Sequence, residues 1–192
     1  MSTDRRQLIA AAGLRVVAAG GLRSLTHRAV DAEASMPTGS SSYYFRSREA
    51  LVAACVERLV AIDLEELAAV GLTERQMAVA ELGALGAGLM WRWLHEDAHR
   101  HLARFELLLE SRRRPHLRTE LVRAGEQLRA SMAALLTAQG APDAAERARW
   151  FVACIDGMVF DQLVGVGAAT PLTYDELLAW ATGIVTLVLA PR

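Results

Sequence analysis

Hydroxyl-bearing side chains crowd a short segment near the start of the chain. Six of the seven residues from Thr38 to Tyr44 carry a hydroxyl group. A helix packed in a core has little use for such side chains, whereas a helix in the DNA major groove bonds phosphates and base edges with them. Arg46 and Arg48 follow at once and are placed to meet the phosphate backbone. The segment therefore predicts a DNA-contacting helix.

A second chemical motif lies mid-chain, where residues 95–99 match the pattern H-E-x-x-H. On one continuous helix, His95 and His99 would share a face and bind zinc, with Glu96 as general base for a metal-bound water. His101 lies just beyond. The apolar spacing breaks here, so we expect a helix end and a solvated, charged connection. A helical metal-dependent enzyme that uses these residues is the alternative function, and a regulatory metal site is a further one.

The segments that hold both motifs are predicted to be helical. Apolar residues recur at spacings of three and four, and no strand pattern or internal repeat is present. Leu8, Ala12 and Val16 predict the buried face of the first helix, which Gly20 and Gly21 end. The predicted helices are 4–19, 26–33, 37–44, 48–70, 73–94, 102–114, 116–138, 143–166 and 173–189. The predicted fold class is all-α, with about nine helices.

Residue types at the expected helix ends support these bounds. Thr26, Ser47 and Thr73 are predicted N-caps, because their hydroxyls can accept from the free N–H groups of a first turn. Pro37 suits the first turn of the third helix. Gly71 is expected to close the fourth helix.

Residues 43–51, YYFRSREAL, join adjacent aromatics to a basic, acidic and apolar ending. They resemble the aromatic-aromatic-x-Phe-x-x-Lys/Arg-Glu-x-Leu signature of the tetracycline repressor (TetR) family of bacterial regulators. The resemblance is specific over the first quarter of the chain and implies a helix-turn-helix domain at 1–46 and a ligand-binding and dimerisation domain at 47–192. Further positions with like residues are Thr26, Arg28, Val30, Ala34, Gly39 and Ser40.

The resemblance assigns candidate DNA contacts. Phosphates would be bound by Arg5, Arg6, Thr26, His27, Arg28 and Arg48, and the groove faced by Thr38, Gly39, Ser40, Ser42, Tyr43 and Tyr44. Three positions depart from the family pattern. Ser35 stands where the family usually has glycine in the turn, and would carry about 1–2 kcal/mol of strain if left-handed. Ser42 replaces a tyrosine, and Asp31 replaces a small residue and is expected to add a negative charge near the DNA side.

A small-molecule pocket is implied by the same resemblance. Its candidate lining suits an apolar or aromatic ligand, with Glu106 or Arg104 as an orienting polar group. For each single residue, ordinary core remains the competing interpretation. The candidates are Met90, Trp91, Trp93, Phe105, Glu106, Leu109, Met132, Trp150, Phe151 and Met158. Gly83, Gly86 and Gly88 are expected to be packing positions inside a helix.

The last two predicted helices carry more apolar positions than a one-sided amphipathic helix needs. We interpret them as a dimer interface, with an intramolecular core as the alternative. A protein that contacts one half-site also needs a second copy to recognise a useful length of DNA. The candidate interface residues are Phe151, Ile155, Gly157, Val159, Leu163, Leu177, Ala181, Ile184, Val185 and Val188.

Charge is distributed unevenly along the chain of 192 residues. Residues 1–50 hold seven arginines against four acidic residues, while the remainder holds 14 arginines against 18 acidic residues. A basic N-terminal part on an acidic body suits a DNA-binding domain joined to a domain that does not touch DNA. Arg112, Arg113 and Arg114 are expected to be a solvated helix end rather than a second DNA contact.

Other features exclude further classes of protein. No apolar run reaches the length of a membrane helix, and no signal peptide is expected, so the predicted location is cytoplasmic. Cys55 and Cys154 are expected to be buried thiols in a reducing compartment. No catalytic residue, cofactor or metal is predicted. The function expected is a homodimeric transcriptional repressor that binds a palindromic operator and is released by a small apolar or aromatic effector.

Overall fold

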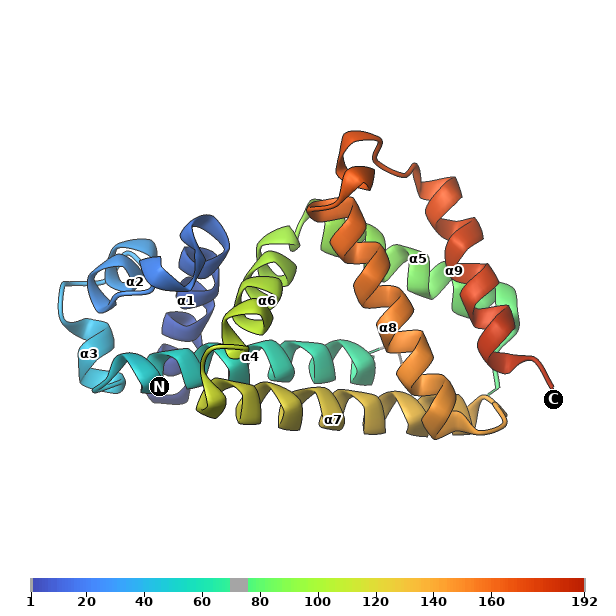
Figure 1. The fold of residues 1–192 in the computed structure, drawn as a ribbon, viewed down its shortest axis with the longest axis horizontal. Coiled ribbons are helices and arrows are strands. Elements are labelled where there is room, and N and C mark those ends of the chain that lie inside the picture. Colours follow the sequence, from blue (N-terminus) through green and yellow to red (C-terminus); the bar gives the residue numbers. More distant parts are fainter. Residues whose placement is uncertain (1, 70–75, 192) are drawn as a thin grey trace. The chain divides into compact units, whose positions relative to one another are not determined.

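The computed structural model describes residues 2–69 and 76–191. Within those ranges it has nine α-helices, one 3₁₀ helix and no strand, which confirms the predicted fold class (Figure 1). The elements are α1 (Ser2–Ser24), α2 (His27–Glu33), α3 (Ser40–Tyr44), α4 (Arg48–Ala69), α5 (Val79–His95), α6 (Ala98–Ser111), α7 (Pro115–Ala138), α8 (Ala144–Leu163), η1 (Val166–Ala169) and α9 (Tyr174–Leu189). None of the helices described is long and apolar enough to cross a bilayer.

Two predicted helix ends fall partly outside the described residues. Val70, Gly71 and Thr73 belong to that gap, so the predicted end of the fourth helix and the predicted N-cap of the fifth lie outside the described residues. The fifth helix begins at Val79 rather than near residue 73, because residues 76–78 are not helical. The backbone N–H of Ala78 donates to Glu81 Oε2 over 2.9 Å, which satisfies one N–H at this helix start.

The chain forms two compact units. The first unit holds residues 1–62 and 99–125, and the second holds residues 63–98 and 126–192. The first therefore contains α1, α2, α3 and most of α4 and α6. The predicted division of the chain at residues 46 and 47 stays a prediction.

The core of the first unit shows where α1 presents its apolar side chains. Ile9, Leu14 and Val17 are fully buried, whereas Leu8 is exposed. Ala12 is also fully buried and Val16 packs against the core, so the predicted face is confirmed for these two residues and wrong for Leu8. α1 and α4 approach each other closely here: a Cβ at Gly13 would lie 2.6 Å from Cys55 Sγ, so only glycine fits between the two helices.

The turn between α2 and α3 contains two left-handed residues. Thr26 caps α2 as predicted, accepting from the Ala29 N–H over 3.1 Å. Ser35 has φ 51° and Gly39 has φ 94°. Because Ser35 is left-handed, it carries the backbone strain of about 1–2 kcal/mol expected for a residue other than glycine. Residues 37–39 form a turn, so α3 begins at Ser40 and not at Pro37.

The second unit is built around α5 and α9, which lie side by side (Figure 1). A Cβ at Gly83 would lie 2.3 Å from Thr182 Oγ1, which confirms Gly83 as a packing position. Gly86 would make only an ordinary contact with Ala181, and a Cβ at Gly88 would meet nothing within 4 Å. The prediction for Gly88 is therefore wrong within the chain, because its side of α5 faces open space.

Side chains close the ends of α9. Thr173 accepts from the Glu176 N–H over 3.3 Å, and Glu176 in turn accepts from the Thr173 N–H over 2.9 Å. At the other end, the Arg147 guanidinium on α8 donates to the carbonyls of Val188 and Ala190 over 3.0 and 2.7 Å. Because the last carbonyls of a helix lack intrahelical partners, this arginine fixes the end of α9 to α8.

Candidate nucleic-acid interface

The outer face of α3 and its preceding turn is polar and uncovered. Thr38, Ser42 and Tyr43 are exposed, and Tyr43 reaches 76% exposure. The Tyr43 ring stands edge-on against Tyr44, with centroids 5.2 Å apart. Such a face offers hydroxyl groups and an aromatic ring to a partner that can accept and donate hydrogen bonds.

All three serines of α3 donate to backbone carbonyls of the first unit. Ser40 Oγ donates to the Pro37 carbonyl over 2.6 Å, and Ser42 Oγ donates to the Gly39 carbonyl over 2.8 Å. Both hydroxyls remain able to accept a further hydrogen bond. Ser41 differs, because it is buried and its Oγ donates to the His27 carbonyl over 3.1 Å. One helix therefore presents Ser42 outward and uses Ser41 to attach to α2.

Asp31 does not place a charge on the outer surface, which corrects the expectation from the sequence. Its side chain is buried, with the residue 2% exposed. Oδ2 accepts from the Gly39 N–H and Oδ1 from the Ser41 N–H, each over 2.7 Å. Burial alone would raise the pKa of Asp31, but the hydrogen bonds from Ser41 and Gly39 and the charge of His27 outweigh it and lower the pKa. Asp31 is therefore ionised at neutral pH.

The C-terminal end of α3 is attached separately. His27 Nε2 donates to the Phe45 carbonyl over 2.7 Å, and Arg6 Nη1 donates to the Tyr44 carbonyl over 3.2 Å. The Arg6 guanidinium also lies over the Phe45 ring, 4.6 Å from its centroid. Two of the residues predicted to bind phosphates thus also hold the end of α3 in place.

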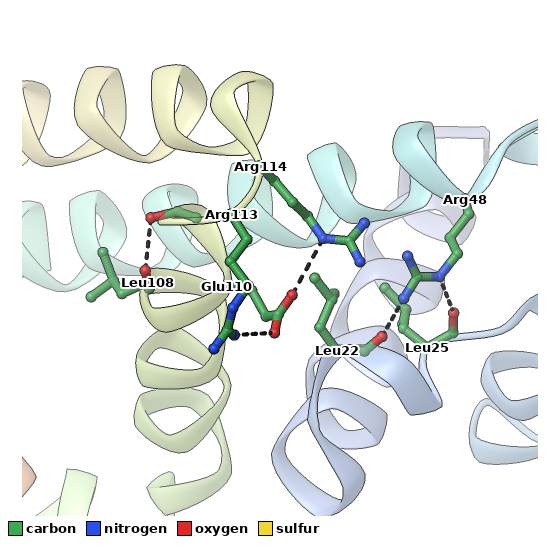
Figure 2. Close-up of polar contacts among 8 residues, drawn as sticks. Leu22, Leu25, Arg48, Leu108, Glu110, Arg113 and Arg114 are labelled. Carbon is green, nitrogen blue, oxygen red and sulfur yellow. Dashed lines mark hydrogen bonds and ion pairs between the residues drawn. The ribbon is translucent and has the colours of Figure 1, made fainter.

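The remaining candidate phosphate contacts differ in how they are held. Arg5, Thr26 and Arg28 are exposed. Arg48 is half-buried, and its guanidinium donates from Nε to the Leu25 carbonyl over 3.1 Å and from Nη2 to the Leu22 carbonyl (Figure 2). These bonds tie the start of α4 to the last turn of α1 and to the residue that directly follows α1. Arg48 has a structural role that the sequence did not indicate, and its phosphate contact stays a prediction.

The arginine run after α6 is partly neutralised within the first unit. Figure 2 shows Glu110 between two of these arginines: its carboxylate accepts from Arg113 Nη1 over 3.1 Å and from Arg114 Nε over 3.3 Å. Both pairs span a single helix end. This arrangement agrees with the solvated helix end expected from the sequence.

The candidate ligand-lining residues fall in both units. In the second unit, Met90 is buried beside partly buried Trp91, Trp93 and Met158, while Met132 and Phe151 belong to a separate apolar cluster. Trp93 Nε1 donates to Glu66 Oε2 over 3.1 Å. Phe105, Glu106 and Leu109 belong to the first unit, where the Glu106 carboxylate lies 3.2 Å from the Cβ position of Gly21 and Leu109 is exposed. These assignments stay predictions.

The H-E-x-x-H segment does not lie on one helix. α5 ends at His95 and α6 begins at Ala98, so the break falls where the apolar spacing predicted it. His95 stacks on Trp91 with ring centroids 3.8 Å apart and donates from Nδ1 to the Trp91 carbonyl. Burial and the charges of Arg104 and Arg100 lower the pKa of His101 to about 2. Within residues 2–69 and 76–191, no three His, Cys, Asp or Glu side chains are grouped to hold a metal.

α8 leaves an apolar face uncovered by its own chain. Trp150 and Phe160 are exposed large apolar residues on this helix, and so is Val164, which directly follows it. A Cβ at Gly157 would meet nothing within 4 Å, and the same holds for Gly183 on α9. Cys154 is exposed on α8, so the prediction that it is buried is wrong, whereas Cys55 is buried as predicted. We call the face formed by Trp150, Cys154, Gly157, Phe160 and Val164 the α8 face.

Several predicted interface residues pack inside the chain instead of on the α8 face. Val159, Leu177, Ala181, Val185 and Val188 are buried in the second unit. Phe151, Ile155, Leu163 and Ile184 are partly buried. Apolar spacing could not separate the two sets, because both a core face and a partner-binding face are apolar.

The residues that sequence reasoning missed are Asp31 as an anchor of α3, Arg48 as a tie between α4 and α1, and Glu66 as the carboxylate bonded to Trp93. Glu66 also accepts from Arg92 Nη2. A signal was available only for Asp31. An acidic residue on the inner face of a short helix, before a turn with glycine and serine, is typical of a side chain that caps the following helix.

Comparisons with known proteins agree with this geometry. Residues 87–187 match a family model described as Tetracyclin repressor-like, C-terminal domain. No curated protein matches the chain significantly. The multidrug binding protein EbrR complexed with ethidium is 31% identical, with a TM-score of 0.65 over 96% of this chain and 97% of that one. EbrR complexed with proflavin is 30% identical, with a TM-score of 0.58 over 96% and 99%.

A TetR family member from Streptomyces coelicolor A3 is 29% identical, with a TM-score of 0.71 over 97% of this chain and 99% of that chain. A transcriptional regulator from Rhodococcus sp. Rha1 is 22% identical, with a TM-score of 0.75 over 96% and 95%, and shows the shared fold alone. The family model covers more than half of the chain, and the two short helices α2 and α3, joined by a turn, lie where the sequence predicts them. The chain belongs to the TetR family of transcriptional regulators.

Proposed function

We propose that this protein is a homodimeric repressor that binds a palindromic DNA operator and is released from it by a small apolar or aromatic effector. The observation that carries the proposal is the polar outer face of α3, attached at both ends to the rest of the first unit. A helix with polar side chains facing outward and a fixed backbone suits direct contact with base edges in a major groove.

The DNA contacts divide into two classes by side-chain chemistry. Arg5, Arg28 and Arg48 would neutralise phosphates, and this part of the affinity is insensitive to sequence and falls as salt rises. Ser42 and Tyr43 would contact base edges, and this part distinguishes one sequence from another. The contact with base edges would be supported or extended by Thr38, Gly39, Ser40 and Tyr44.

The α8 face supports the proposal that two copies associate. Exposed Trp150, Phe160 and Val164 keep apolar surface in water, which is unfavourable by about 25 cal/mol per Å². Gly157 and Gly183 have no neighbour at their Cβ positions within the chain. Small residues with open space above them let a helix from a second copy approach closely. The symmetry of such a dimer would place two α3 helices on two half-sites.

The effector class follows from the aromatic content of the second unit and from the similarity to EbrR, which is complexed with ethidium and with proflavin. Trp91, Trp93 and Met158, which belong to one apolar cluster, would contact a flat aromatic molecule. An effector can release the DNA only if it binds one conformation of the dimer better than another. We propose a regulatory and not a catalytic role, since His95 and His99 do not share a helix.

The proposal is tested in two steps. Random double-stranded DNA is first selected on the purified protein, and we expect recovery of a palindromic sequence. Ethidium and proflavin are then added to the complex in a thermal-shift and a DNA-release assay. A ligand at 100 times its dissociation constant stabilises the protein by about 2.7 kcal/mol. Recovery of no preferred sequence would refute the repressor function, and stabilisation without release would refute the effector role of these dyes.

A further inference from the structure

Asp31 is the only acidic side chain described that bonds the backbone at the start of α3. Its two oxygens accept from the N–H groups of Gly39 and Ser41, each over 2.7 Å. Its own carbonyl accepts from the Met36 N–H over 2.8 Å. A single residue of α2 is thus bonded to three points of the turn and of the helix that follow it.

α3 needs such support because it is very short. It spans five residues, Ser40–Tyr44. The first four N–H groups of any helix lack intrahelical partners, so a helix of this length has almost no hydrogen bonds of its own. Short isolated helices are also marginal in water. The geometry of α3 is therefore set by the contacts that hold it to its neighbours.

The position of the Asp31 bonds determines which side chains face outward. Successive residues of a helix are rotated by about 100° around its axis. Anchoring the Ser41 backbone and burying its side chain therefore turns Ser42 and Tyr43 to the uncovered side. His27 and Arg6 hold the other end of α3 through the carbonyls of Phe45 and Tyr44. With Asp31 removed, the C-terminal end stays attached while the N-terminal end can rotate or fray.

We propose that Asp31 is a positioning residue that sets the DNA sequence preference of this protein without touching DNA. The inference rests on the proposed function and deepens it: the buried carboxylate fixes the rotation of α3, and the rotation fixes which base edges Ser42 and Tyr43 meet. Loss of the carboxylate weakens the distinction between operator and other DNA. It leaves the phosphate contacts, which depend on Arg5 and Arg28, in place.

The test compares Asp31→Ala and Asp31→Asn with Glu33→Ala. Glu33 lies on the same helix, is exposed and pairs with Arg15, so this control removes the same charge without touching α3. For each protein, the ratio of operator to random-DNA affinity and the salt dependence are measured, with hydrogen exchange followed by mass spectrometry over residues 37–45. Circular dichroism and sedimentation check the fold and the oligomeric state.

We expect Asp31→Ala to lower the operator-to-random ratio at least tenfold, with random-DNA binding and its salt slope unchanged. Exchange at residues 39–41 should accelerate while that of α4 stays as in the wild type. Asp31→Asn should lower the operator-to-random ratio by less than Asp31→Ala. The asparagine oxygen can still accept from one of the two N–H groups, but its NH₂ group cannot accept from the other. Glu33→Ala should match the wild type in every measurement.

The opposing results are distinct. An unchanged ratio and unchanged exchange in folded Asp31→Ala would overturn the inference. If Asp31→Ala unfolds, the folded Asp31→Asn variant decides, and a wild-type ratio there overturns the inference as well. If the wild-type protein itself prefers no DNA sequence, the proposed function fails, and the sequence-setting role of Asp31 fails with it. The exchange data then still show whether Asp31 holds α3.

Discussion

α3 in the first unit and α8 in the second each have one face that is exposed among the described residues, and the two faces are chemically opposite. The outer face of α3 carries Ser42 and Tyr43, whereas the α8 face carries Trp150 and Phe160. A polar face stays solvated until a partner replaces the water, but an apolar face is unfavourable for as long as it is exposed. The α3 face therefore suits a partner that comes and goes, and the α8 face suits one that remains bound.

The largest effect is expected from a substitution on the α8 face, where a second copy would bind. Gly157→Leu should dissociate the dimer, because overpacking costs about 1–3 kcal/mol per site and symmetry repeats the lesion. The monomer should stay folded, since a Cβ at this position meets no atom of the described residues within 4 Å. Sedimentation over a range of concentrations measures the dissociation.

Gly88→Leu is the matched control, because Gly88 also lies on a helix with open space at its Cβ position. This variant should remain dimeric and should gain the same helix propensity as the Gly157 variant. If both variants and the wild type have equal dimer affinity, the interface lies elsewhere, and a second copy does not bind the α8 face.

The α3 face is expected to give the second largest effect. Tyr43→Ala should lose about 1–3 kcal/mol of operator affinity at each half-site, the range of a base contact. Binding to random DNA should persist with an unchanged salt slope. Quantitative footprinting measures both, and Tyr43→Phe separates the hydroxyl from the ring. An unchanged footprint in Tyr43→Ala would show that the α3 face does not contact bases.

Arg48 is expected to give a smaller effect of two kinds. Arg48→Ala should lower the free energy of unfolding by about 1–2 kcal/mol, since it removes hydrogen bonds from a partly exposed charged group to the carbonyls of Leu22 and Leu25. It should also lower the salt slope of DNA binding by about one per subunit. Thermal denaturation and salt titration measure the two separately.

Arg46→Ala is the control for Arg48, because Arg46 is exposed and lies two residues earlier. Its removal should change the salt dependence without loss of stability. A destabilised Arg48→Ala protein with a wild-type slope would mean that Arg48 acts only inside the protein.

The smallest expected effect is chemical. Cys154 on the α8 face should react with iodoacetamide several-fold more slowly as the dimer forms, because a second copy covers it. Burial raises the pKa of Cys55 to about 12, so its reactive thiolate is scarce at pH 8 and it should stay unmodified in both states. Mass spectrometry of the alkylated peptides follows both thiols. A Cys154 rate that is independent of protein concentration would contradict coverage of this face.

The two faces also differ in how well the sequence predicts them. The hydroxyl groups of residues 38–44 identify α3 directly, because no core helix has this composition. The α8 face could not be separated from the core by apolar spacing, which describes Val159 and Phe160 alike although one is buried and the other exposed. The predicted helix bounds agree with the structure within a few residues where a predicted cap, Thr26 or Ser47, defines the start of the helix.

The sequence does not identify the hydrogen-bond partners of Arg48 and Asp31. Arg48 was assigned to phosphate because its position favours that contact, yet its partners within the chain are the carbonyls of Leu22 and Leu25, some 23 or more residues away. Asp31 was assigned to the surface by its charge, although two N–H groups nearby stabilise that charge in a buried place. In both cases the deciding partner is a backbone group, and the sequence offers a signal only for Asp31, which precedes a turn with glycine and serine.

The two left-handed residues of the turn before α3 bear on how this protein can change by mutation. Ser35 and Gly39 need a backbone conformation that suits glycine best and asparagine or aspartate next, and that β-branched residues rarely adopt. Thr38 between them is exposed and has no such constraint. A library randomised over residues 35–39 should thus return a narrow choice at 35 and 39 and a broad one at 38. Under the proposed function, substitutions at position 38 would change the DNA preference without disturbing the turn that presents this residue.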